Sequence, residues 1–176
     1  GYFRDFGEGY GPRALVNQGG GEYVYGWVAP GTNTPLDLSL SGGNGRDRNS
    51  SNTDQRFDTL MHMQADDVTN FNGVRAEGAW EIELPNGIYN VTVAVGDPTV
   101  NTPVERHYVR VEGQAVISNF QPTGVAGDPA RHKVAAAQVT VSDGRLTVDA
   151  QLTGSYNTKL NFIEIVQSDG SPPRPT

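Results

Sequence analysis

Cysteine is absent from the 176-residue chain, which excludes both a disulfide framework and chemistry at a thiolate but leaves the cellular compartment open. No run of apolar residues is long enough to cross a bilayer, so membrane insertion is not expected. Lysine is scarce, with only Lys133 and Lys159, and the formal net charge is -7. A nucleic acid is therefore not an expected partner, because phosphate binding requires a basic face.

Motifs for catalysis are also missing. There is no Gly-x-Ser-x-Gly nucleophile elbow, and the glycines at 19–21 are not followed by the Lys-Ser/Thr of a phosphate-binding loop. Asp66 and Asp67 are neighbours on an extended segment, so their side chains point in opposite directions. Glu81 and Glu83 share a face, but their alternation with apolar residues is typical of the solvated side of a strand. We therefore expect a protein without catalytic activity.

Apolar residues instead recur at every second position through most of the chain, which is the spacing of half-buried strands. The clearest segments are Trp80–Pro98 and Ala135–Leu152, and each is interpreted as a hairpin, with turns at Pro85–Gly87 and Ser142–Gly144. Further strands are expected at Tyr2–Gly7, Glu22–Val28, Phe57–Gln64, Tyr108–Val111 turning at Gly113 into Gln114–Phe120, and Lys159–Gln167. No segment has a convincing helical period. About eight to ten short antiparallel strands predict an all-β fold, an antiparallel β-sandwich.

The sandwich is expected to span residues 1–168, and residues 169–176 are expected to be a Pro/Ser-rich linker or tail. The chain starts at Gly1 rather than at Met and shows no signal peptide, so we expect a fragment or a processed form of a larger protein. Neighbouring domains of that protein are then expected partners. The domain itself is expected to be a monomer.

The segment 28–56 is longer than a plain connection in a compact domain needs. It contains several glycines and asparagines, and its second half is rich in arginine and aspartate. Long loops on a sandwich are where binding residues gather. The segment is therefore expected either to hold a ligand or to close on itself through its own charges.

Several motifs, in order along the chain, resemble the malectin-like domains of bacterial secreted and surface proteins. The motifs are YGWVAPGTNTPLDL from Tyr25, GRDRN from Gly45, DQRFDTLMHMQ from Asp54, WEIELPNGIYNVTVAVGDP from Trp80 and NFIEI from Asn161. The resemblance covers most of the chain. It implies a galactose-binding-like jelly roll, related to carbohydrate-binding modules, that binds a polysaccharide or glycan through loops at one end of the sandwich. It also implies a secreted or cell-surface location.

Sugar binding combines an aromatic face against the C–H groups of a pyranose with planar polar side chains that hydrogen-bond adjacent hydroxyls. The candidate carbohydrate-binding residues are Tyr23, Tyr25 and Trp27 for stacking, and Arg46, Arg48, Asn49, Asp54, Arg56 and Asp97 for hydrogen bonds. Each has a structural alternative. The three rings share one face of a strand, which is also the pattern of a core. The arginines can pair with Asp47, Asp54 or Asp58 merely to hold the loop shut, and Asp97 can cap a turn.

A metal site has weaker signals. His62 and Asp58 fall on the same face of the predicted strand 57–64, which suggests a hydrogen-bonded pair or a metal site. A satisfied structural histidine is the alternative, and no zinc-ligand spacing is present. The resemblance also implies a structural calcium ion near the chain ends. Calcium prefers oxygen ligands, and the candidate ligands on the first and last strands are Asp5, Glu8, Asn161 and Glu164.

Two hypotheses follow for the function. The first is a non-catalytic carbohydrate-binding module that targets a larger secreted protein or enzyme. It predicts a concave site with an exposed ring. The second is a structural or adhesive spacer, or a protein-interaction domain, of a bacterial surface protein. It predicts that the loop 28–56 is closed by salt bridges and offers no concave surface.

Overall fold

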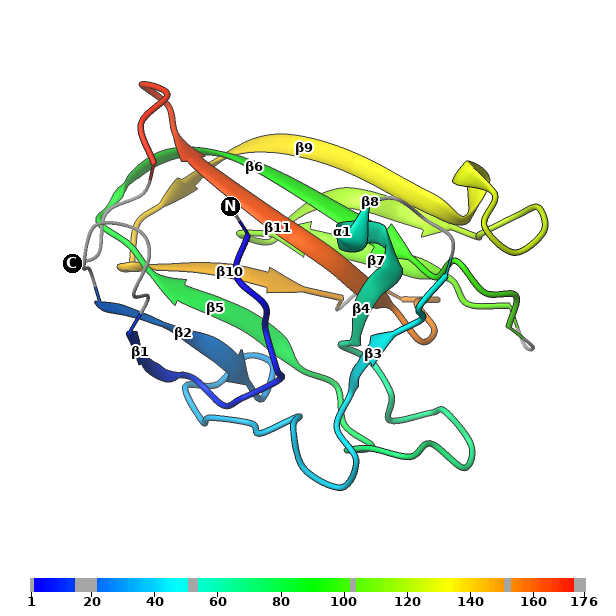
Figure 1. Cartoon of the computed structure of the whole chain (residues 1–176). Coiled ribbons are helices and arrows are strands. Elements are labelled where there is room, and N and C mark those ends of the chain that lie inside the picture. The colour runs from blue at the N-terminus through cyan, green and yellow to red at the C-terminus, as the bar shows by residue number, and fades with distance from the viewer. Residues whose placement is uncertain (1, 15–21, 51–53, 102–103, 151–152, 173–176) are drawn as a thin grey trace.

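The computed structural model describes residues 2–14, 22–50, 54–101, 104–150 and 153–172 as two antiparallel sheets packed face to face (Figure 1). One sheet has the strand order β1-β2-β5-β10-β7-β8, and the other has the order β3-β4-β11-β6-β9. The bounds are β1 Gly11–Ala14, β2 Glu22–Val28, β3 Gly45–Asp47, β4 Thr59–His62, β5 Ala79–Glu83, β6 Gly87–Gly96, β7 His107–Val111, β8 Gln114–Phe120, β9 His132–Val141, β10 Arg145–Asp149 and β11 Lys159–Gln167. The predicted all-β sandwich is confirmed.

The order of the strands is that of a jelly roll. The eight strands from β4 to β11 form two four-stranded sheets, β4-β11-β6-β9 and β5-β10-β7-β8. Each strand in this series crosses to the opposite sheet from the one before it, except at the β7–β8 hairpin. Strands β1, β2 and β3 widen the two sheets at their edges. The jelly roll therefore follows from the pairing pattern itself.

Two predicted hairpins are wrong for the same reason. β5 pairs with β2 and β10, whereas β6 pairs with β11 and β9, so the turn at Pro85–Gly87 carries the chain between sheets. The turn at Ser142–Gly144 does the same between β9 and β10. The two turns lie side by side, because Asn86 donates to the carbonyl of Ser142 and accepts from the amide of Gly144. Turn chemistry signals a reversal of the chain but not which sheet the next strand joins.

The predicted strand 57–64 begins too early. Residues Gln55–Asp58 form a single helical turn, α1, and β4 starts at Thr59. The Asp54 carboxylate caps this turn by accepting from the amide of Arg56. A second short helix, η1, spans Pro129–Arg131. Both are single helical turns, which the alternation of apolar and polar residues in the sequence does not reveal.

The core lies between the sheets and follows the predicted alternation. Trp80 and Ile82 on β5 and Leu84 just after it are buried, and Val91, Val93 and Val95 on β6 belong to the same core. Trp80 belongs to the core. Among the described residues no helix is long and apolar enough to span a bilayer.

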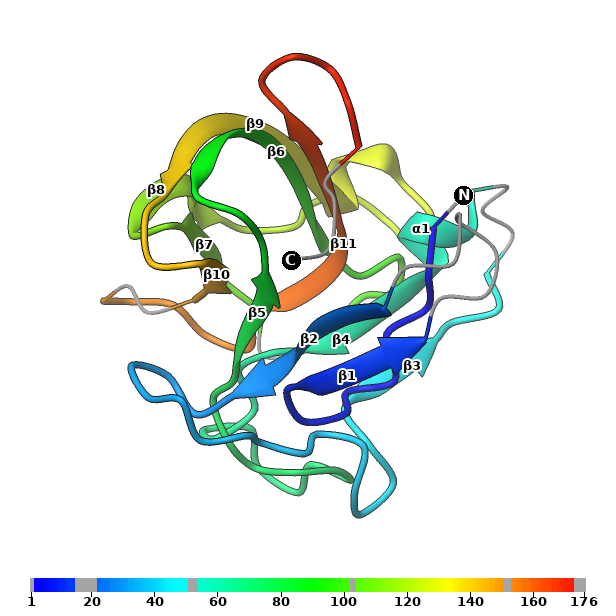
Figure 2. The same cartoon turned by 90° about the vertical axis from the view of Figure 1, so that its left-hand side faces the viewer.

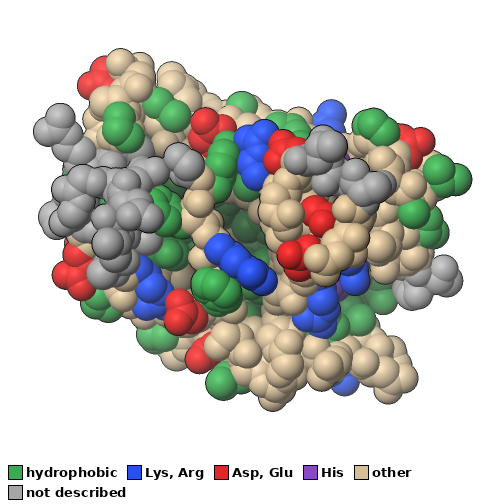
Figure 3. Space-filling view, viewed as in Figure 1, with side chains coloured by type: hydrophobic (Ala, Val, Ile, Leu, Met, Phe, Trp, Pro, Cys, Tyr) green, Lys and Arg blue, Asp and Glu red, His purple; other side chains and the backbone are tan. Residues whose placement is uncertain are grey.

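The N-terminal segment from Tyr2 to Tyr10, predicted as a strand up to Gly7, is an irregular strap that links the two sheets. Tyr2 donates a hydrogen bond to Glu164 on β11, and the amide of Tyr10 donates to the carbonyl of Trp27 on β2. Figure 2 shows this segment running from beside α1 towards β1. On the face seen in Figure 3, acidic and basic side chains lie next to one another beside exposed hydrophobic ones, so this face has no continuous field of one sign.

The C-terminal end of the described chain folds back on the sandwich. After β11, the amide of Ser168 donates to the carbonyl of Ile88, and the amide of Gln167 donates to the carbonyl of Ser171. The predicted linker 169–176 thus begins as a turn against β6. Its last residues, 173–176, lie outside the described part of the chain.

Candidate functional site

A cavity of about 320 Å³ lies on the outer face of the β1-β2-β5-β10-β7-β8 sheet. We call it the sheet groove, and its lining consists of Gly31, Thr32, Asn33, Glu81, Arg110, Thr147 and Asp149. The strands supply its floor by alternation: Ile82, Leu146 and Val109 point into the core, so their neighbours face outward. The tip of the long loop 28–56 supplies one wall.

The floor of the sheet groove is a row of paired polar groups. Arg145 donates to Glu81 at 2.9 Å across the β5–β10 pairing, and Arg110 donates to Asp149 at 2.8 Å across the β10–β7 pairing. The Thr147 hydroxyl lies between these pairs and donates to Glu81 at 3.4 Å. Alternate residues on β10 carry this row from Arg145 to Asp149, a span of about 13 Å at the usual rise of a strand. The floor therefore offers hydrogen-bond donors and acceptors side by side along an elongated surface.

Two tyrosines lie next to this row. The guanidinium of Arg145 lies over the ring of Tyr10, with 4.2 Å from Cζ to the ring centroid, and its Nη1 also reaches Asn33 at 3.4 Å. The Tyr10 hydroxyl oxygen is buried and has no hydrogen-bond partner within the described chain. Tyr108 is half-buried on β7, two residues before Arg110 and on the same face. Tyr108 is thus a partly exposed ring beside the polar floor.

Carboxylates surround the sheet groove. Burial and the nearby charges of Asp66 and Asp149 raise the pKa of Glu77, which precedes β5. Burial, which outweighs a hydrogen bond from the Thr147 amide, and the charges of Asp143 and Glu81 raise the pKa of Glu112, which follows β7. In both residues burial is the larger cause, and neighbouring carboxylates add to it.

The predicted stacking residues lie elsewhere. Trp27 is 1% exposed and belongs to the core, so its ring has no face open to a sugar in this structure. Tyr23 and Tyr25 are partly buried against the same core, and the Tyr25 ring lies 5.8 Å from that of Trp80. The alternative that these rings pack in the core therefore holds for Trp27 and, in part, for Tyr23 and Tyr25.

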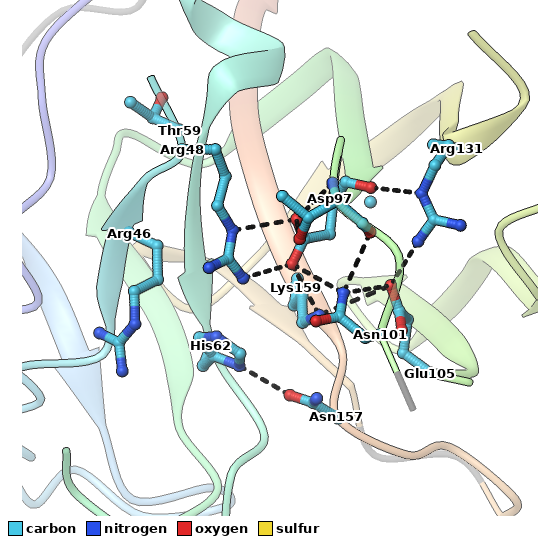
Figure 4. A network of polar contacts seen from close by, with 12 residues as sticks. Arg46, Arg48, Thr59, His62, Asp97, Asn101, Glu105, Arg131, Asn157 and Lys159 are labelled. Carbon is cyan, nitrogen blue, oxygen red and sulfur yellow. Dashed lines mark hydrogen bonds and ion pairs between the residues drawn. The ribbon is translucent and has the colours of Figure 1, made fainter. Parts of the chain in front are cut away.

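Arg48 and Asp97 are brought together, but inside the protein (Figure 4). Arg48 donates from Nε and Nη2 to the two carboxylate oxygens of Asp97 at 3.0 and 2.5 Å, and the Asp97 side chain has no exposed surface. Lys159 donates to the same carboxylate at 2.8 Å. Asp97 also caps a turn, as its structural alternative predicted, because it accepts from the amide and the hydroxyl of Thr99. Burial alone would raise the pKa of Asp97, but the hydrogen bonds from Arg48 and the charge of Lys159 hold it well below its usual range.

The network around Asp97 continues inward to Glu105. Arg131 donates to the Asp97 carbonyl and, at 3.3 Å, to the Glu105 carboxylate, and Lys159 lies 3.5 Å from that carboxylate (Figure 4). Glu105 and His107 are completely buried, and Glu105 Oε2 and His107 Nε2 have no hydrogen-bond partner within the described chain. Burial and the positive charge of Lys159 lower the pKa of His107 well below its usual value. These contacts tie β6, β7 and β11 together across the two sheets.

The remaining predicted carbohydrate-binding residues also belong to the loop 28–56 and do not line the sheet groove. Arg46 donates to the carbonyls of Gly43, Gly45 and Asn72. Asn49 is exposed and adopts a positive φ of 47°. Arg56 pairs with Asp54 at 2.7 Å, and its guanidinium carbon lies 4.9 Å from the ring centre of Tyr2 and 5.0 Å from that of Phe162. None of the predicted carbohydrate-binding residues lines the sheet groove.

The four predicted calcium ligands do not converge in the structure. Asp5 accepts hydrogen bonds from the indole nitrogens of Trp27 at 3.1 Å and Trp80 at 2.8 Å. The other three have different partners: Glu8 pairs with Arg13, Asn161 donates to the Thr59 carbonyl, and Glu164 accepts from Tyr2. Within the described ranges, no three His, Cys, Asp or Glu side chains lie close enough together to hold a metal ion.

The predicted pairing of His62 with Asp58 is wrong. His62 Nδ1 hydrogen-bonds Asn157 at 2.7 Å, whereas Asp58 accepts from the amide of Ser50 at 2.9 Å. The two side chains separate because Asp58 ends the helical turn α1 and only His62 lies on β4.

Sequence reasoning missed the residues of the sheet groove. Their signal was present as polar residues that alternate with apolar ones, namely Arg145, Thr147 and Asp149 on β10 and Tyr108 and Arg110 on β7. Such a pattern is also that of an ordinary solvated face, as assumed for Glu81. Glu81 is in fact 8% exposed, because Arg145 and the loop wall cover it.

Comparisons with known proteins give distant likenesses only. No family model matches the chain, and no curated protein matches it. Among solved structures, protein YXIM from Bacillus subtilis is 22% identical over 73% of this chain and 31% of its own, with a TM-score of 0.39. A family 35 carbohydrate-binding module from Clostridium thermocellum is 15% identical over 69% of this chain and 91% of its own, with a TM-score of 0.35.

An exo-β-1,3-galactanase from Phanerochaete chrysosporium is 12% identical over 81% of this chain and 32% of its own, with a TM-score of 0.36. The chain thus spans about a third of the Bacillus protein and of the galactanase. At such identities and TM-scores these likenesses carry no argument about a ligand or an activity. The malectin-like assignment stays a prediction.

Proposed function

We propose that this chain is a non-catalytic carbohydrate-binding domain and that its sugar site is the sheet groove. The observation that carries the proposal is a row of paired polar side chains on a concave surface. Glu81, Arg110, Thr147 and Asp149 line it, and Arg145 pairs with Glu81 from beside it. Binding sites for small molecules and sugars are concave, with a few polar groups in fixed positions. This location replaces the loop end that the resemblance implies.

The chemistry of the floor suits vicinal hydroxyl groups. A guanidinium paired with a carboxylate presents N–H donors and an acceptor oxygen next to each other, and their mutual hydrogen bond holds both in place. Thr147 adds a hydroxyl between the two pairs. Tyr108, half-buried at the side of Arg110, is the ring that we assign to stacking on a sugar face.

The same pairs argue against hydrolysis. A glycosidase requires one carboxylic acid that stays protonated and one free carboxylate across the scissile bond. Glu81 and Asp149, the two carboxylates in the lining, each pair with an arginine. Neither lining carboxylate is thus left to act as the acid or the base across a scissile bond.

Titration calorimetry with a panel of oligosaccharides tests the proposal. The groove variant Thr147→Val keeps the shape of the side chain but removes its hydroxyl, and Thr140→Val is the matched control on β9 of the other sheet. Loss of one hydrogen bond predicts a decrease in affinity of about two- to tenfold for the first variant only. Equal affinities for both variants, or no binding by the unaltered chain, would contradict the proposal.

The spacer hypothesis has one observation in its favour. The arginines of the loop 28–56 are held by Asp54, by Asp97 and by backbone carbonyls, as a self-closed loop requires. The hypothesis also requires that the loop border no concave surface, whereas its tip at Gly31–Asn33 lines the sheet groove. Absence of any glycan affinity would leave the spacer as the better description.

Secretion, attachment to a larger chain and a structural calcium ion remain part of the proposal. Calcium binding can be tested separately. If calcium binds the folded state, millimolar calcium raises the melting temperature relative to EDTA. In the structure the four predicted ligands have separate partners and do not form a calcium site together; they are Asp5, Glu8, Asn161 and Glu164.

A further inference from the structure

The charges on the floor of the sheet groove balance one another. Glu81 is matched by Arg145 and Asp149 by Arg110, and both N···O distances are below 3 Å. A carboxylate on the sugar would have to compete with Glu81 or Asp149 for its guanidinium. An ammonium on the sugar would have to compete with Arg145 or Arg110 for its carboxylate. Hydroxyl groups are uncharged and both donate and accept, so they can hydrogen-bond this row without displacing either partner of an ion pair.

The rim of the groove is acidic. Glu83 faces outward on β5 beyond Glu81, and Glu77 and Glu112 stand at the ends of β5 and β7. Even when Arg106, just before β7, is counted with Arg110 and Arg145, the carboxylates on this side outnumber the guanidiniums. An anionic ligand is therefore repelled as it approaches, and this repulsion weakens at high ionic strength.

We propose that the ligand of the sheet groove is a neutral glycan, built from uncharged hexose or pentose units, and that uronate-bearing and sulfated glycans are excluded. This inference rests on the proposed function. The observations that carry it are the two closed ion pairs on the floor and the excess of carboxylates at the rim. The neutral sugar is held by its hydroxyls, and the acidic rim provides the selection against anions.

The test measures the affinity of the unaltered chain for oligosaccharides of equal length: xylotetraose, mannotetraose and cellotetraose as neutral probes, tetragalacturonate as the anionic probe and chitosan tetramer as the cationic probe. At least one neutral probe is expected to bind at least tenfold more tightly than tetragalacturonate at low salt. Tighter binding of tetragalacturonate or of the chitosan tetramer would overturn the neutral assignment and leave carbohydrate binding intact. Failure of all five probes to bind would overturn the proposed function itself.

One variant distinguishes the effect of the rim charges on ligand selection from that of the floor. Glu77→Gln removes a rim charge without touching the lining of the groove, and its Oε1 has no hydrogen-bond partner to lose within the described chain. In this variant the ratio of the affinity for the neutral probe to that for the anionic probe is expected to fall about two- to threefold at low salt. The affinity for the neutral probe itself is expected to be unchanged. The control Glu8→Gln removes an exposed charge on the strap. An equal change in both variants would contradict selection by the rim.

Discussion

Arg48 and Asp97 lie 49 residues apart in the chain and form a two-point ion pair on a carboxylate that has no exposed surface. The pair joins the long loop 28–56 to the end of β6, and Lys159 ties the same carboxylate to β11. Both residues were predicted to contact a sugar. In the structure their shared role is to fasten the loop to the sandwich.

The first prediction concerns this pair. Asp97→Asn removes the negative charge that compensates Arg48 and Lys159, and breaking a buried pair from one side typically costs about 3–5 kcal/mol of unfolding free energy. Asp54→Asn breaks the exposed pair with Arg56 and is expected to cost far less, because solvent screens both side chains. Urea unfolding of the two variants measures the difference. Similar losses would show that Asp97 is not the fastening point.

The second prediction concerns pH. Burial, the first cause, and the charge of Lys159 lower the pKa of His62 to about 3, against 6.5 for a free histidine. Because the unfolded chain binds a proton near pH 6.5 and the folded chain does not, stability is full above that pH and falls as the pH decreases towards 3. Each such histidine contributes a slope of up to about 1.4 kcal/mol per pH unit.

His62→Gln tests this dependence, because glutamine can still donate towards Asn157 but does not titrate. Unfolding free energies at pH 7, 6, 5 and 4 are expected to fall less steeply in the variant than in the unaltered chain. His107, whose pKa is also lowered by burial, keeps part of the slope. An unchanged slope would mean that His62 is accessible to protons in the folded state.

The third prediction concerns the N-terminal strap. The Asp5 carboxylate accepts from both core indoles and from the amide of Gly7. Asp5→Asn leaves one buried donor without an acceptor, at a cost of about 1–3 kcal/mol. Hydrogen exchange at the amides of Tyr10 and Trp27, which bond between strap and β2, is expected to accelerate. Glu8→Gln is the control, and equal exchange in the two variants would refute the role of Asp5.

The fourth prediction concerns Gly26. A Cβ at this position on β2 would lie 2.7 Å from the carbonyl oxygen of Glu8, and the backbone has a φ of 139°. Gly26→Ala therefore pushes the strap off β2 and is expected to cost about 2 kcal/mol or more. Gly87→Ala, where the nearest atom would lie 3.7 Å away, is expected to cost less than about 1 kcal/mol. Thermal unfolding of both variants measures the contrast.

The sequence predicts much of the fold and little of the site. Period-two patterns locate the strand Lys159–Gln167 and the buried face of β5 because alternation is a local property. The partner sheet of β6 and β10 is not local, so both predicted hairpins failed. The arginines of the loop were conspicuous in sequence but are held by Asp97, by Asp54 and by backbone carbonyls. Arg110 and Thr147 looked ordinary and line a groove that only the pairing of β5, β10 and β7 assembles.

Sugar binding in the sheet groove can be located by titrating the isotope-labelled chain with neutral oligosaccharides and following its amide chemical shifts. We expect the changed shifts to gather at Asn33, Glu81, Arg110, Thr147 and Asp149, on the outer face of the β1-β2-β5-β10-β7-β8 sheet. Changes confined to Arg46, Arg48 and Asp54 would contradict it and return the sugar site to the loop. A complete absence of changes would contradict carbohydrate binding.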